Sequence, residues 1–407
     1  MKVLLVSEYF PPKVQGGGEI SAYLLAKNLV KQGIRVHILT SKFDNQEEFE
    51  YNEDGIKIHR LLLTGEPNSF CGNMDRALSF DDSISSNKVK FFLHFHNFNI
   101  IHSMNSTSLP GVSRLEGKKV AHINSPVPFC PKGNLIYKGE ECKGKCNLMK
   151  CMLSSREIGK MKNSFYLKYN PVFWWYLKAK QKALQNSLKH FDHIFPTSTH
   201  LKNKLIETGI TKDKITILPN IVETEKFGYK KTNGKKLKIL YLGAYIKSKG
   251  VWDLLLALQG VNFKYQCNFY GEGLLKQELK NYVEHYKLNV KINDKTNNIQ
   301  KVINKHDVVV MPSIVPEAFG RIAIETMASG KIIIGRDRGG LKDIITDNKT
   351  GFLFDDVNEL RELLGMISRN NIINKNVVMK EAQEYEGEKI AKKAIKVYKK
   401  ILKCQTK

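Results

Sequence analysis

Short β-branched runs alternate along this chain with longer segments whose apolar residues recur at helical spacing. The run KVLLVS at residues 2–7 precedes a segment in which every third or fourth residue is apolar, namely Ile20, Tyr23, Leu24, Ala26 and Leu29. Such spacing predicts an amphipathic helix, and Gly33 marks its end. RVHILTS at residues 35–41 has the pattern of a second strand. This strand–helix–strand order predicts a parallel sheet of the doubly wound α/β type.

The same alternation continues and divides the chain into two halves. Further strands are predicted in the first half at residues 56–63, 99–105, 118–126, 192–198 and 214–220, and in the second at 238–243, 265–270, 289–293, 307–311 and 332–335. Pro219 and Asn220, followed by the lysine- and glycine-rich segment 228–236, indicate a crossing between domains. We therefore expect one domain over residues 1–218, a second over 219–376, and a closing lysine-rich amphipathic helix in 377–407.

Bulk properties narrow the class of protein. The 407 residues suffice for two or three domains, and no apolar run approaches the ~18 residues of a membrane span. The first run meets Ser7 and Glu8 where the apolar core of a signal peptide would continue. The sequence therefore predicts a cytoplasmic protein.

The formal net charge of +25 would attract anionic lipid headgroups, nucleic acid or acidic polysaccharide. The alternative is that the charge reflects only a lysine-rich host composition. The sequence contains no zinc-finger spacing, RNP motif or helix-turn-helix pattern, which argues against nucleic acid as a partner.

Residues 312–330, PSIVPEAFGRIAIETMASG, carry the clearest candidate chemistry. The apolar run DVVVM leads into a loop, and a helix is predicted directly after it. Three backbone N–H groups would then be unpaired at the positive end of the helix dipole, where an anion such as phosphate can bind: those of Phe319, Gly320 and Arg321. Glu317 in the loop and Glu325 in the helix could accept hydrogen bonds from sugar hydroxyls. The alternative is an ordinary strand–helix turn with two solvated glutamates.

A second glycine-rich turn follows the first predicted strand. Gly16, Gly17 and Gly18 precede the predicted helix and could bring backbone N–H groups close to a phosphate or a sugar. The spacing matches neither a dinucleotide-binding fingerprint nor a P-loop, so a flexible turn is the alternative.

The chain resembles the retaining GT-B enzymes of glycosyltransferase family 4, most clearly in its second half. The resemblance rests on PEAFGRIAIE followed by TMASGKIIIGRDRGGLKDIITDNKTGFLF, which holds two glutamates with seven residues between them, the strand IIIG and the Gly339–Gly340 turn. It covers most of the chain and is strongest from Lys238 to Phe354. It implies two doubly wound Rossmann-like domains that face a cleft, with the C-terminal helix crossing back toward the first domain.

The resemblance also implies a nucleotide-sugar donor, such as a UDP- or GDP-sugar, and roles for particular residues. The positions that match the family's donor site are Gly16, Gly17, Gly243, Lys249, Asp294, Phe319, Gly320, Arg321 and Glu325. Lys249 would grip the diphosphate and Glu325 the ribose hydroxyls, while Glu317 would lie near the transferred sugar. No metal is implied for catalysis, because lysine and helix dipoles hold the diphosphate in this fold.

Two positions depart from the family's pattern. The family has an arginine where this chain has Ala244, and Lys247 offers only a point charge in its place. The family has a His-Asp pair near the reaction centre where this chain has Asn124 and Ser125. Either His122, two residues earlier on the same face of the strand, takes the catalytic role, or Asn124 takes it by hydrogen bonding. A core histidine is the alternative for His122.

Four of the seven cysteines lie in the loop 130–151, namely Cys130, Cys142, Cys146 and Cys151. In a reducing cytosol such clustering favours a metal, and four thiolates would make a structural zinc site. The spacing lacks the CxxC pair of a strong zinc motif. Zinc and plain buried or disulfide-bonded cysteines therefore both remain open.

Segment 171–182, PVFWWYLKAKQK, joins an aromatic run to three lysines. Pro171 can open a helix. Aromatic residues beside lysines are typical of helices at a membrane interface, and a helix packed into the first domain is the alternative. Together with the net charge, this segment predicts peripheral attachment at the inner face of an anionic membrane.

The resemblance implies a retaining hexosyltransferase that moves a sugar from a nucleotide-diphosphate donor to a glycan or a lipid-linked acceptor. Catalysis would rest on positioning and on stabilisation of the departing diphosphate. Two other classes stay open: a sugar-nucleotide epimerase of the same fold, which needs no acceptor, and a non-catalytic binding subunit, suggested by Ala244 and Asn124.

Overall fold

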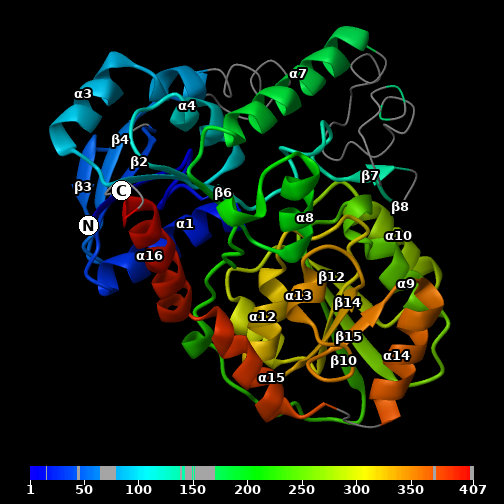
Figure 1. The fold of residues 1–407 in the computed structure, drawn as a ribbon. Coiled ribbons are helices and arrows are strands. Elements are labelled where there is room, and N and C mark those ends of the chain that lie inside the picture. Colours follow the sequence, from blue (N-terminus) through cyan, green and yellow to red (C-terminus); the bar gives the residue numbers. More distant parts are fainter. Residues whose placement is uncertain are drawn as a thin grey trace. The chain divides into compact units, whose positions relative to one another are not determined.

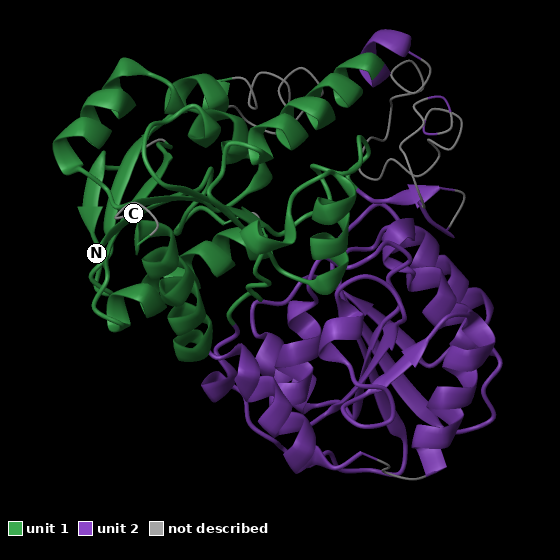
Figure 2. Cartoon of the chain, viewed as in Figure 1, with its two compact units in different colours: residues 1–133, 175–221, 387–407 green, residues 134–174, 222–386 purple. Residues whose placement is uncertain are grey.

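The structure is a computed structural model that describes residues 1–14, 16–43, 46–64, 79–137, 140–142, 149, 151, 170–369 and 373–403. The chain forms two compact units (Figure 2). The first comprises residues 1–133, 175–221 and 387–407, and the second comprises residues 134–174 and 222–386. Each unit is an α/β sandwich built around its own parallel sheet (Figure 1).

The sheet of the first unit has seven strands in the order β3-β4-β2-β1-β5-β6-β9. Its parallel strands are β1 (Lys2–Val6), β2 (Arg35–Ser41), β4 (Lys57–Leu62), β5 (Ile100–Ser103), β6 (Lys119–Ile123) and β9 (His193–Pro196). The short edge strand β3 (Phe49–Tyr51) runs antiparallel to β4. Because the chain starts in the middle and winds outward in both directions, the strand order reverses between β1 and β5.

Helices cover the sheet of the first unit. α1 (Gly17–Lys31) and α16 (Gly387–Lys403) share one apolar core with alternate residues of the central strands. The described helices of this unit also include α3 (Asn87–His96), α4 (Leu109–Ser113), α8 (Thr199–Glu207) and the part of α7 (Pro171–Leu188) from residue 175 onward. α4 packs on β5 and β6, and α8 packs on β9.

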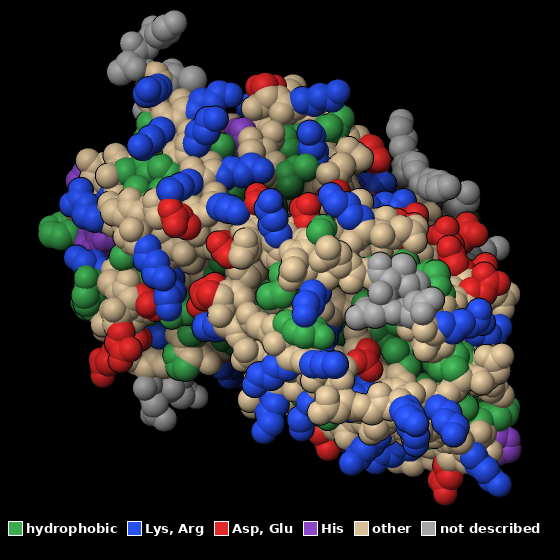
Figure 3. Space-filling model, turned by 90° about the horizontal axis from the view of Figure 1, so that it is seen from below, with side chains coloured by type: hydrophobic (Ala, Val, Ile, Leu, Met, Phe, Trp, Pro, Cys, Tyr) green, Lys and Arg blue, Asp and Glu red, His purple; other side chains and the backbone are tan. Residues whose placement is uncertain are grey.

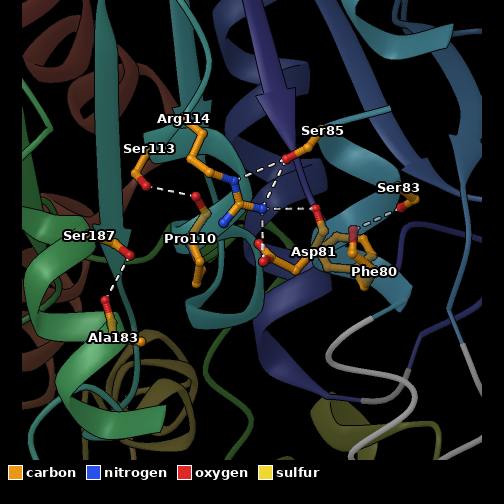
Figure 4. A network of polar contacts seen from close by, with 9 residues as sticks. All are labelled: Phe80, Asp81, Ser83, Ser85, Pro110, Ser113, Arg114, Ala183 and Ser187. Carbon is orange, nitrogen blue, oxygen red and sulfur yellow. Dashed lines mark hydrogen bonds and ion pairs between the residues drawn. The ribbon is translucent and has the colours of Figure 1, made fainter. Parts of the chain in front are cut away.

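A polar network fixes the end of α4 to the helical residues 79–84 (Figure 4). The Arg114 guanidinium lies 2.8 Å from an Asp81 carboxylate oxygen and donates to the Ser85 hydroxyl at 2.9 and 3.1 Å. Gly111 of α4 faces Ile84 so closely that a Cβ at this position would lie 2.8 Å from the isoleucine side chain. The glycine therefore permits the close approach of the two segments.

The sheet of the second unit has six parallel strands in the order β12-β11-β10-β13-β14-β15. The strands are β10 (Leu237–Leu242), β11 (Tyr265–Tyr270), β12 (Val290–Asn293), β13 (Val308–Met311), β14 (Ile332–Arg336) and β15 (Phe352–Phe354). Here the order reverses between β10 and β13. A two-stranded hairpin of β7 (Ile136–Tyr137) and β8 (Glu140–Glu141) belongs to the same unit.

Two sets of helices sandwich this sheet. α9 (Val251–Gln259), α10 (Lys276–His285) and α14 (Val357–Arg369) share one apolar core with it. α11 (Ile299–Asn304), α12 (Arg321–Ala328), α13 (Leu341–Ile344) and α15 (Lys375–Ala382) share the other. In the described parts of the chain, no helix combines the length and the apolar character that crossing a membrane requires.

Two sequence expectations about elements are corrected. Residues 214–220 form no strand, because only Ile215 makes a bridge, to Ile194, before Pro219 removes a backbone donor. The closing helix is broken by the 3₁₀ turn Gln383–Tyr385 (η6), so that α15 ends in the second unit and α16 belongs to the first. α16 begins at Gly387, where a Cβ would lie 2.2 Å from the Asn28 side chain. A glycine at this point lets α16 begin against α1.

Candidate functional site

Most of the predicted donor-site residues of the second unit lie in the segments that follow β10 and β13, whereas Asp294 follows β12. β10 and β13 are neighbours, and the sheet order reverses between them. Ligands of doubly wound sheets bind outside such a reversal, because the connections from the two strands leave toward opposite faces and open a crevice. Three connections meet there, those over residues 243–250, 312–320 and 337–340.

Lys249 and Glu317 form an ion pair across this reversal. The Lys249 Nζ lies 2.5 Å from the Glu317 Oε1, and both side chains are partly buried. Burial by itself would raise the pKa of Glu317, but the charge of Lys249 and hydrogen bonds from Lys249 and Ser313 hold that pKa below its ordinary value. Glu317 is thus ionised at neutral pH, where it can accept hydrogen bonds but cannot donate a proton.

The backbone around Lys249 is locked to the loop that carries Glu317. Gly250 has a positive φ of 66°, and a Cβ there would lie 1.8 Å from the Pro312 carbonyl oxygen. Ile314 and Val315 donate their N–H groups to the Ser248 carbonyl at 3.0 and 3.3 Å. Only glycine fits this contact, which fixes the register of the two connections against each other.

A third connection holds the backbone of Glu317 from the other side. The Gly340 N–H donates to the Glu317 carbonyl at 2.6 Å, and Gly339 takes a positive φ of 63° beside it. The Arg338 Nη1 donates to the Ile314 carbonyl at 3.0 Å. Sequence reasoning assigned no role to Arg338 or to Ser313, although each stands just after a predicted strand, the position from which ligand-site residues come in this fold.

Helix α12 begins at Arg321, as the sequence predicts. Its N-cap Gly320 has φ 112° and ψ 54°, and within the described structure no side chain caps the first turn. A Cβ on Gly320 would lie 2.7 Å from the Leu341 side chain. Phe319 is buried and meets the Tyr385 ring edge-on, with 5.7 Å between the ring centroids. The helix therefore presents an uncapped N-terminus next to the ion pair, which suits an anion.

Glu325 lies in the second turn of α12 and is only 5% exposed. Its Oε1 accepts from the Arg321 guanidinium at 3.4 Å, and its Oε2 has no hydrogen-bond partner among the described residues. Burial raises the pKa of Glu325, partly offset by the charge of Arg321. A buried acceptor without a donor suits a ligand hydroxyl, which can reach it only after a local side-chain movement.

Gly243 and Asp294 lie at the carboxyl ends of β10 and β12. The Tyr245 hydroxyl donates to the Asn293 carbonyl at 2.6 Å and ties these ends together. Asp294 itself is largely exposed and pairs with Lys276. The contact expected between this turn and a nucleotide base stays a prediction.

In the first unit, the structure brings Asn124 next to the glycine-rich loop. The Asn124 amide donates to the Met104 carbonyl at 3.2 Å, and a Cβ on Gly18 would lie 3.3 Å from its nitrogen. α1 begins at Gly17, and the Gly16 N–H already donates to the Glu19 carboxylate at 2.8 Å. Gly17, Gly18 and Asn124 thus form one polar corner, while the N–H of Gly16 is engaged within the helix cap.

His122 lies in the core of the first unit. Its side chain is buried, and neither ring nitrogen has a hydrogen-bond partner in the part of the chain that the structure describes. The ring is stacked on His102, with 5.7 Å between centroids. Burial lowers the pKa of His122 to about 4. This geometry favours the core-histidine alternative and makes Asn124 the better candidate for the catalytic position.

The zinc hypothesis stays a prediction. Cys130 and Cys151 are buried, and Cys142 is partly buried. Cys146 lies outside the described residues.

The aromatic segment forms α7, which begins at Pro171 as predicted. Trp174 is fully buried, and Trp175 is 68% exposed.

Comparison with known families gives two matches that together span most of the chain. The family described as "Glycosyltransferase Family 4" matches residues 15–226, and the family described as "Glycosyl transferases group 1" matches residues 222–385. An uncharacterized glycosyltransferase of Methanocaldococcus jannaschii is 26% identical, over 98% of both chains. A phosphatidyl-myo-inositol mannosyltransferase of Mycobacterium leprae is 26% identical over 48% of this chain and 53% of its own.

Solved structures show the same fold at low identity. The sucrose-phosphate synthase of Thermosynechococcus elongatus superposes with a TM-score of 0.76 at 16% identity, over 99% of both chains. The HepE protein of Anabaena, solved in complex with UDP, superposes with a TM-score of 0.67 at 14% identity, over 98% of this chain and all of that one. The fold is therefore of the GT-B type, with two Rossmann-like halves.

Proposed function

This chain belongs to the family 4 glycosyltransferases, and on that premise we propose that it transfers a hexosyl group from a nucleotide-diphosphate sugar with retention at the anomeric carbon. The Lys249–Glu317 pair carries the proposal. It joins a cation for the diphosphate to a carboxylate for the sugar, beside the uncapped N-terminus of α12. This combination is what a donor with two phosphates and a hydroxylated ring requires.

The proposed donor is a UDP-sugar, with a GDP-sugar as the alternative. Support comes from the HepE protein, which was solved with UDP and with UDP-glucose. Lys249 and the α12 N-terminus would hold the diphosphate, and Glu325 the ribose hydroxyls through its unpartnered Oε2. In the first unit, Gly17 and Asn124 are the proposed substrate contacts, and Gly16 would have to release its N–H from Glu19 to join them.

The proposed chemistry relies on the leaving group. As the bond from the anomeric carbon to the diphosphate oxygen breaks, negative charge grows on that oxygen, and Lys249 and the backbone N–H groups at Gly320 and Arg321 stabilise it without reorganisation. The acceptor hydroxyl oxygen forms the new bond to the anomeric carbon on the same face, and its proton passes to the departing diphosphate oxygen. Glu317, kept ionised by Lys249, accepts hydrogen bonds from the sugar and holds its ring in place. No step in this scheme requires a metal ion.

The proposed acceptor is a glycan or a lipid-linked saccharide at the inner face of a membrane. Relatives named phosphatidyl-myo-inositol mannosyltransferase and phosphatidylinositol N-acetylglucosaminyltransferase subunit support a lipid-linked acceptor. The net charge of +25 supports contact with an anionic surface.

A donor screen with stereochemical analysis of the product tests the proposal. Thermal unfolding is followed with UDP-, GDP-, ADP- and TDP-sugars, and the stabilising donor is incubated with acceptor glycans. Retention predicts a product whose anomeric configuration, read by proton NMR coupling, equals that of the donor. A free epimer would identify an epimerase, and no stabilisation by any of the donors would favour a binding subunit without catalysis.

A further inference from the structure

One face of the second unit's sheet is polar where strands β11 and β12 lie. Along β11, Cys267 and Phe269 are buried in an apolar core, while Gln266, Asn268 and Tyr270 alternate with them toward the opposite face. β12 alternates in the same way, with Lys291 as its most exposed residue. Strands of doubly wound sheets are usually apolar on both faces because helices cover both. The alternation therefore marks an uncovered face.

A hollow of about 860 Å³ lies over this face. It is lined by the polar residues of β11 and β12, by α11 and by the segment 230–233. Six lysines contribute to the lining: Lys230, Lys231, Lys238, Lys291, Lys301 and Lys305. The structure describes every residue of this lining, and none of these residues is acidic. The volume is that of a site for a small to medium ligand.

The positive charge of this hollow is not neutralised from within. Asp307, whose carboxylate accepts from the Thr232 hydroxyl and the Lys238 N–H, adds one negative charge beside the hollow and offsets only one of the six lysines. His306 adds no charge, since both its ring nitrogens are hydrogen-bonded, one to the Asn268 amide at 2.8 Å, and burial lowers its pKa. Six ammonium groups around one concavity thus create a site for anions.

Carboxamides make up much of the remaining lining. Besides the lysines, the hollow is lined by seven asparagine and glutamine residues. Asn304 is 9% exposed, and its Oδ1 has no hydrogen-bond partner among the described residues. Amides both donate and accept, so they match hydroxyl groups, and a buried acceptor left open is costly unless a ligand or water donates to it.

We propose that this hollow is a binding site for an acidic oligosaccharide, a glycan whose sugar units carry carboxylate or phosphate groups. The lysines would pair with the acidic groups and the carboxamides with the hydroxyls. β11 presents its polar side chains over about 13 Å, from Gln266 to Tyr270, which is long enough for more than one sugar unit. The inference goes beyond the transfer reaction and does not depend on it.

Other anionic partners fit the hollow less well. Tyr270 and the buried His306 are the aromatic rings among the described lining residues, whereas sites for single-stranded nucleic acid stack successive bases on several accessible aromatic rings. A membrane surface needs a flat or convex face with exposed apolar anchors, and this site is concave and lined by amides. The chemistry of the lining therefore favours a hydroxylated polyanion.

Binding of a defined uronic-acid oligomer tests the proposal with the full chain. Tetragalacturonate is titrated by calorimetry, with maltotetraose as the neutral control and a single-stranded DNA tetramer as the nucleic-acid control. The double variant Lys291→Glu/Lys301→Glu reverses two lysines of the lining. The matched control Lys396→Glu/Lys399→Glu makes the same charge change on exposed positions of α16 in the first unit. Gln266→Glu adds a single isosteric negative charge within the hollow.

The lining double variant should bind tetragalacturonate about tenfold more weakly, while the α16 double variant should change affinity less than about twofold. Gln266→Glu should weaken binding in the same direction, and maltotetraose should not compete. Equal losses in both double variants would overturn the proposal in favour of net charge alone. Stronger binding of the DNA tetramer, or no tetragalacturonate binding by the wild type, would also overturn it. UDP titrations on the same proteins report the donor site separately, so loss of one site is distinguishable from loss of the other.

Discussion

At the scale of single residues, Lys249 and Glu317 depend on each other. Each is partly buried, and each supplies the opposite charge that the other would otherwise lack. Removing one partner leaves the other as a poorly solvated charge, which costs more than the pair contributes while intact. The pair is therefore better explained by a role in the candidate site than by a contribution to the stability of the fold.

Replacing Lys249 by methionine should weaken nucleotide binding. The change removes the cation that would face the diphosphate and keeps the length and apolar stem of the side chain. We expect a loss of about 1–3 kcal/mol in UDP affinity, or roughly 5- to 150-fold. Calorimetry with UDP measures it, and Lys236→Met, an exposed lysine of the same unit, is the control. Unchanged affinity in Lys249→Met would remove this residue from the donor site.

Glu325→Gln should change the stability of the protein and its affinity for nucleotide in different directions. The substitution removes a buried charge whose Oε2 is unpartnered among the described residues, so the free energy of unfolding should stay equal or rise. If the ribose hydroxyls donate to this carboxylate, nucleotide affinity should fall by about 1–3 kcal/mol. Denaturant unfolding and UDP titration measure the two effects. A variant that loses stability and keeps full affinity would contradict both parts of the argument.

At the scale of elements, the candidate site depends on backbone contacts that only glycine permits. Gly250 faces the Pro312 carbonyl, Gly339 faces the Glu317 backbone, and Gly320 faces Leu341. Each has a positive φ and no room for a Cβ. The contacts at Gly250 and Gly339 are with main-chain atoms, and the contact at Gly320 is with the Leu341 side chain. The connections are therefore positioned largely by main chain, which in turn fixes the functional side chains.

Gly250→Ala should destabilise the second unit by about 2–3 kcal/mol, because the strained φ and the clash with Pro312 add. Gly365 in α14 is the matched control, since a Cβ there meets nothing within 4 Å and the position is helical. Gly365→Ala should stabilise the protein by about 0.5–1 kcal/mol. Denaturant unfolding of both variants measures the contrast. Equal midpoints would mean that the connection relaxes around the added methyl group.

A histidine cluster joins β2, β4 and α3 in the first unit. The His37 Nδ1 lies 2.9 Å from the His59 Nε2, and His96 meets both rings edge-on. Burial, reinforced by neighbouring positive groups, lowers the pKa of His37 to about 3 and that of His59 to about 4. Both imidazoles are therefore neutral in the folded protein near neutral pH.

These lowered pKa values should make the protein acid-sensitive. Unfolded histidines take up protons near pH 6.5 while the folded pair does not, so the pair's contribution is complete above pH 6.5 and is lost as pH falls toward 4. The slope should reach about 1.4 kcal/mol per pH unit for each histidine. Unfolding free energies measured from pH 7 to 4 test this, and the slope should flatten in His37→Leu/His59→Leu. The exposed His94→Gln is the control, and an equally steep slope in the double variant would place the acid sensitivity elsewhere.

At the scale of the whole molecule, positive charge dominates the surface. The formal net charge is +25, and lysine and arginine side chains spread over much of the face in Figure 3. Apolar anchors are also exposed in the first unit: Trp175 of α7 is 68% exposed, and Phe91 and Phe95, one turn apart on α3, are 72% and 75% exposed. Charge and exposed aromatic rings together are what the proposed contact with an anionic membrane would require.

Binding to anionic vesicles should therefore have two components. The electrostatic part, worth about 1 kcal/mol per lysine near the surface, should vanish at high salt, and an aromatic part should remain. Co-sedimentation at low and high salt separates them. Trp175→Ala should reduce the salt-resistant remainder, whereas Trp174→Ala, a core truncation, should chiefly lower stability. No pelleting with anionic vesicles at low salt would point to an acceptor that is not membrane-bound.

The sequence by itself determined the two doubly wound sheets, the helix that begins at Arg321 and the family, because these depend on local periodicity and on motifs that are continuous in the chain. It also determined the polar alternation of β11 and β12, although the hollow over them was not foreseen. Periodicity shows that one side of a strand is polar, but it does not show whether a helix covers that side in the folded protein.

Only the tertiary structure decided the meaning of isolated residues. Lys249 and Glu317 are 68 positions apart, and a long-range strand order brings them together. His122 and Asn124 share one strand face, yet one is enclosed in the core and the other reaches the glycine-rich loop at the strand's end. A helix turns successive side chains by about 100°, so Trp174 and Trp175 face different sides, and packing against distant segments decides that the Trp174 side is the buried one. Burial and pairing are set by distant parts of the chain, and no local pattern contains them.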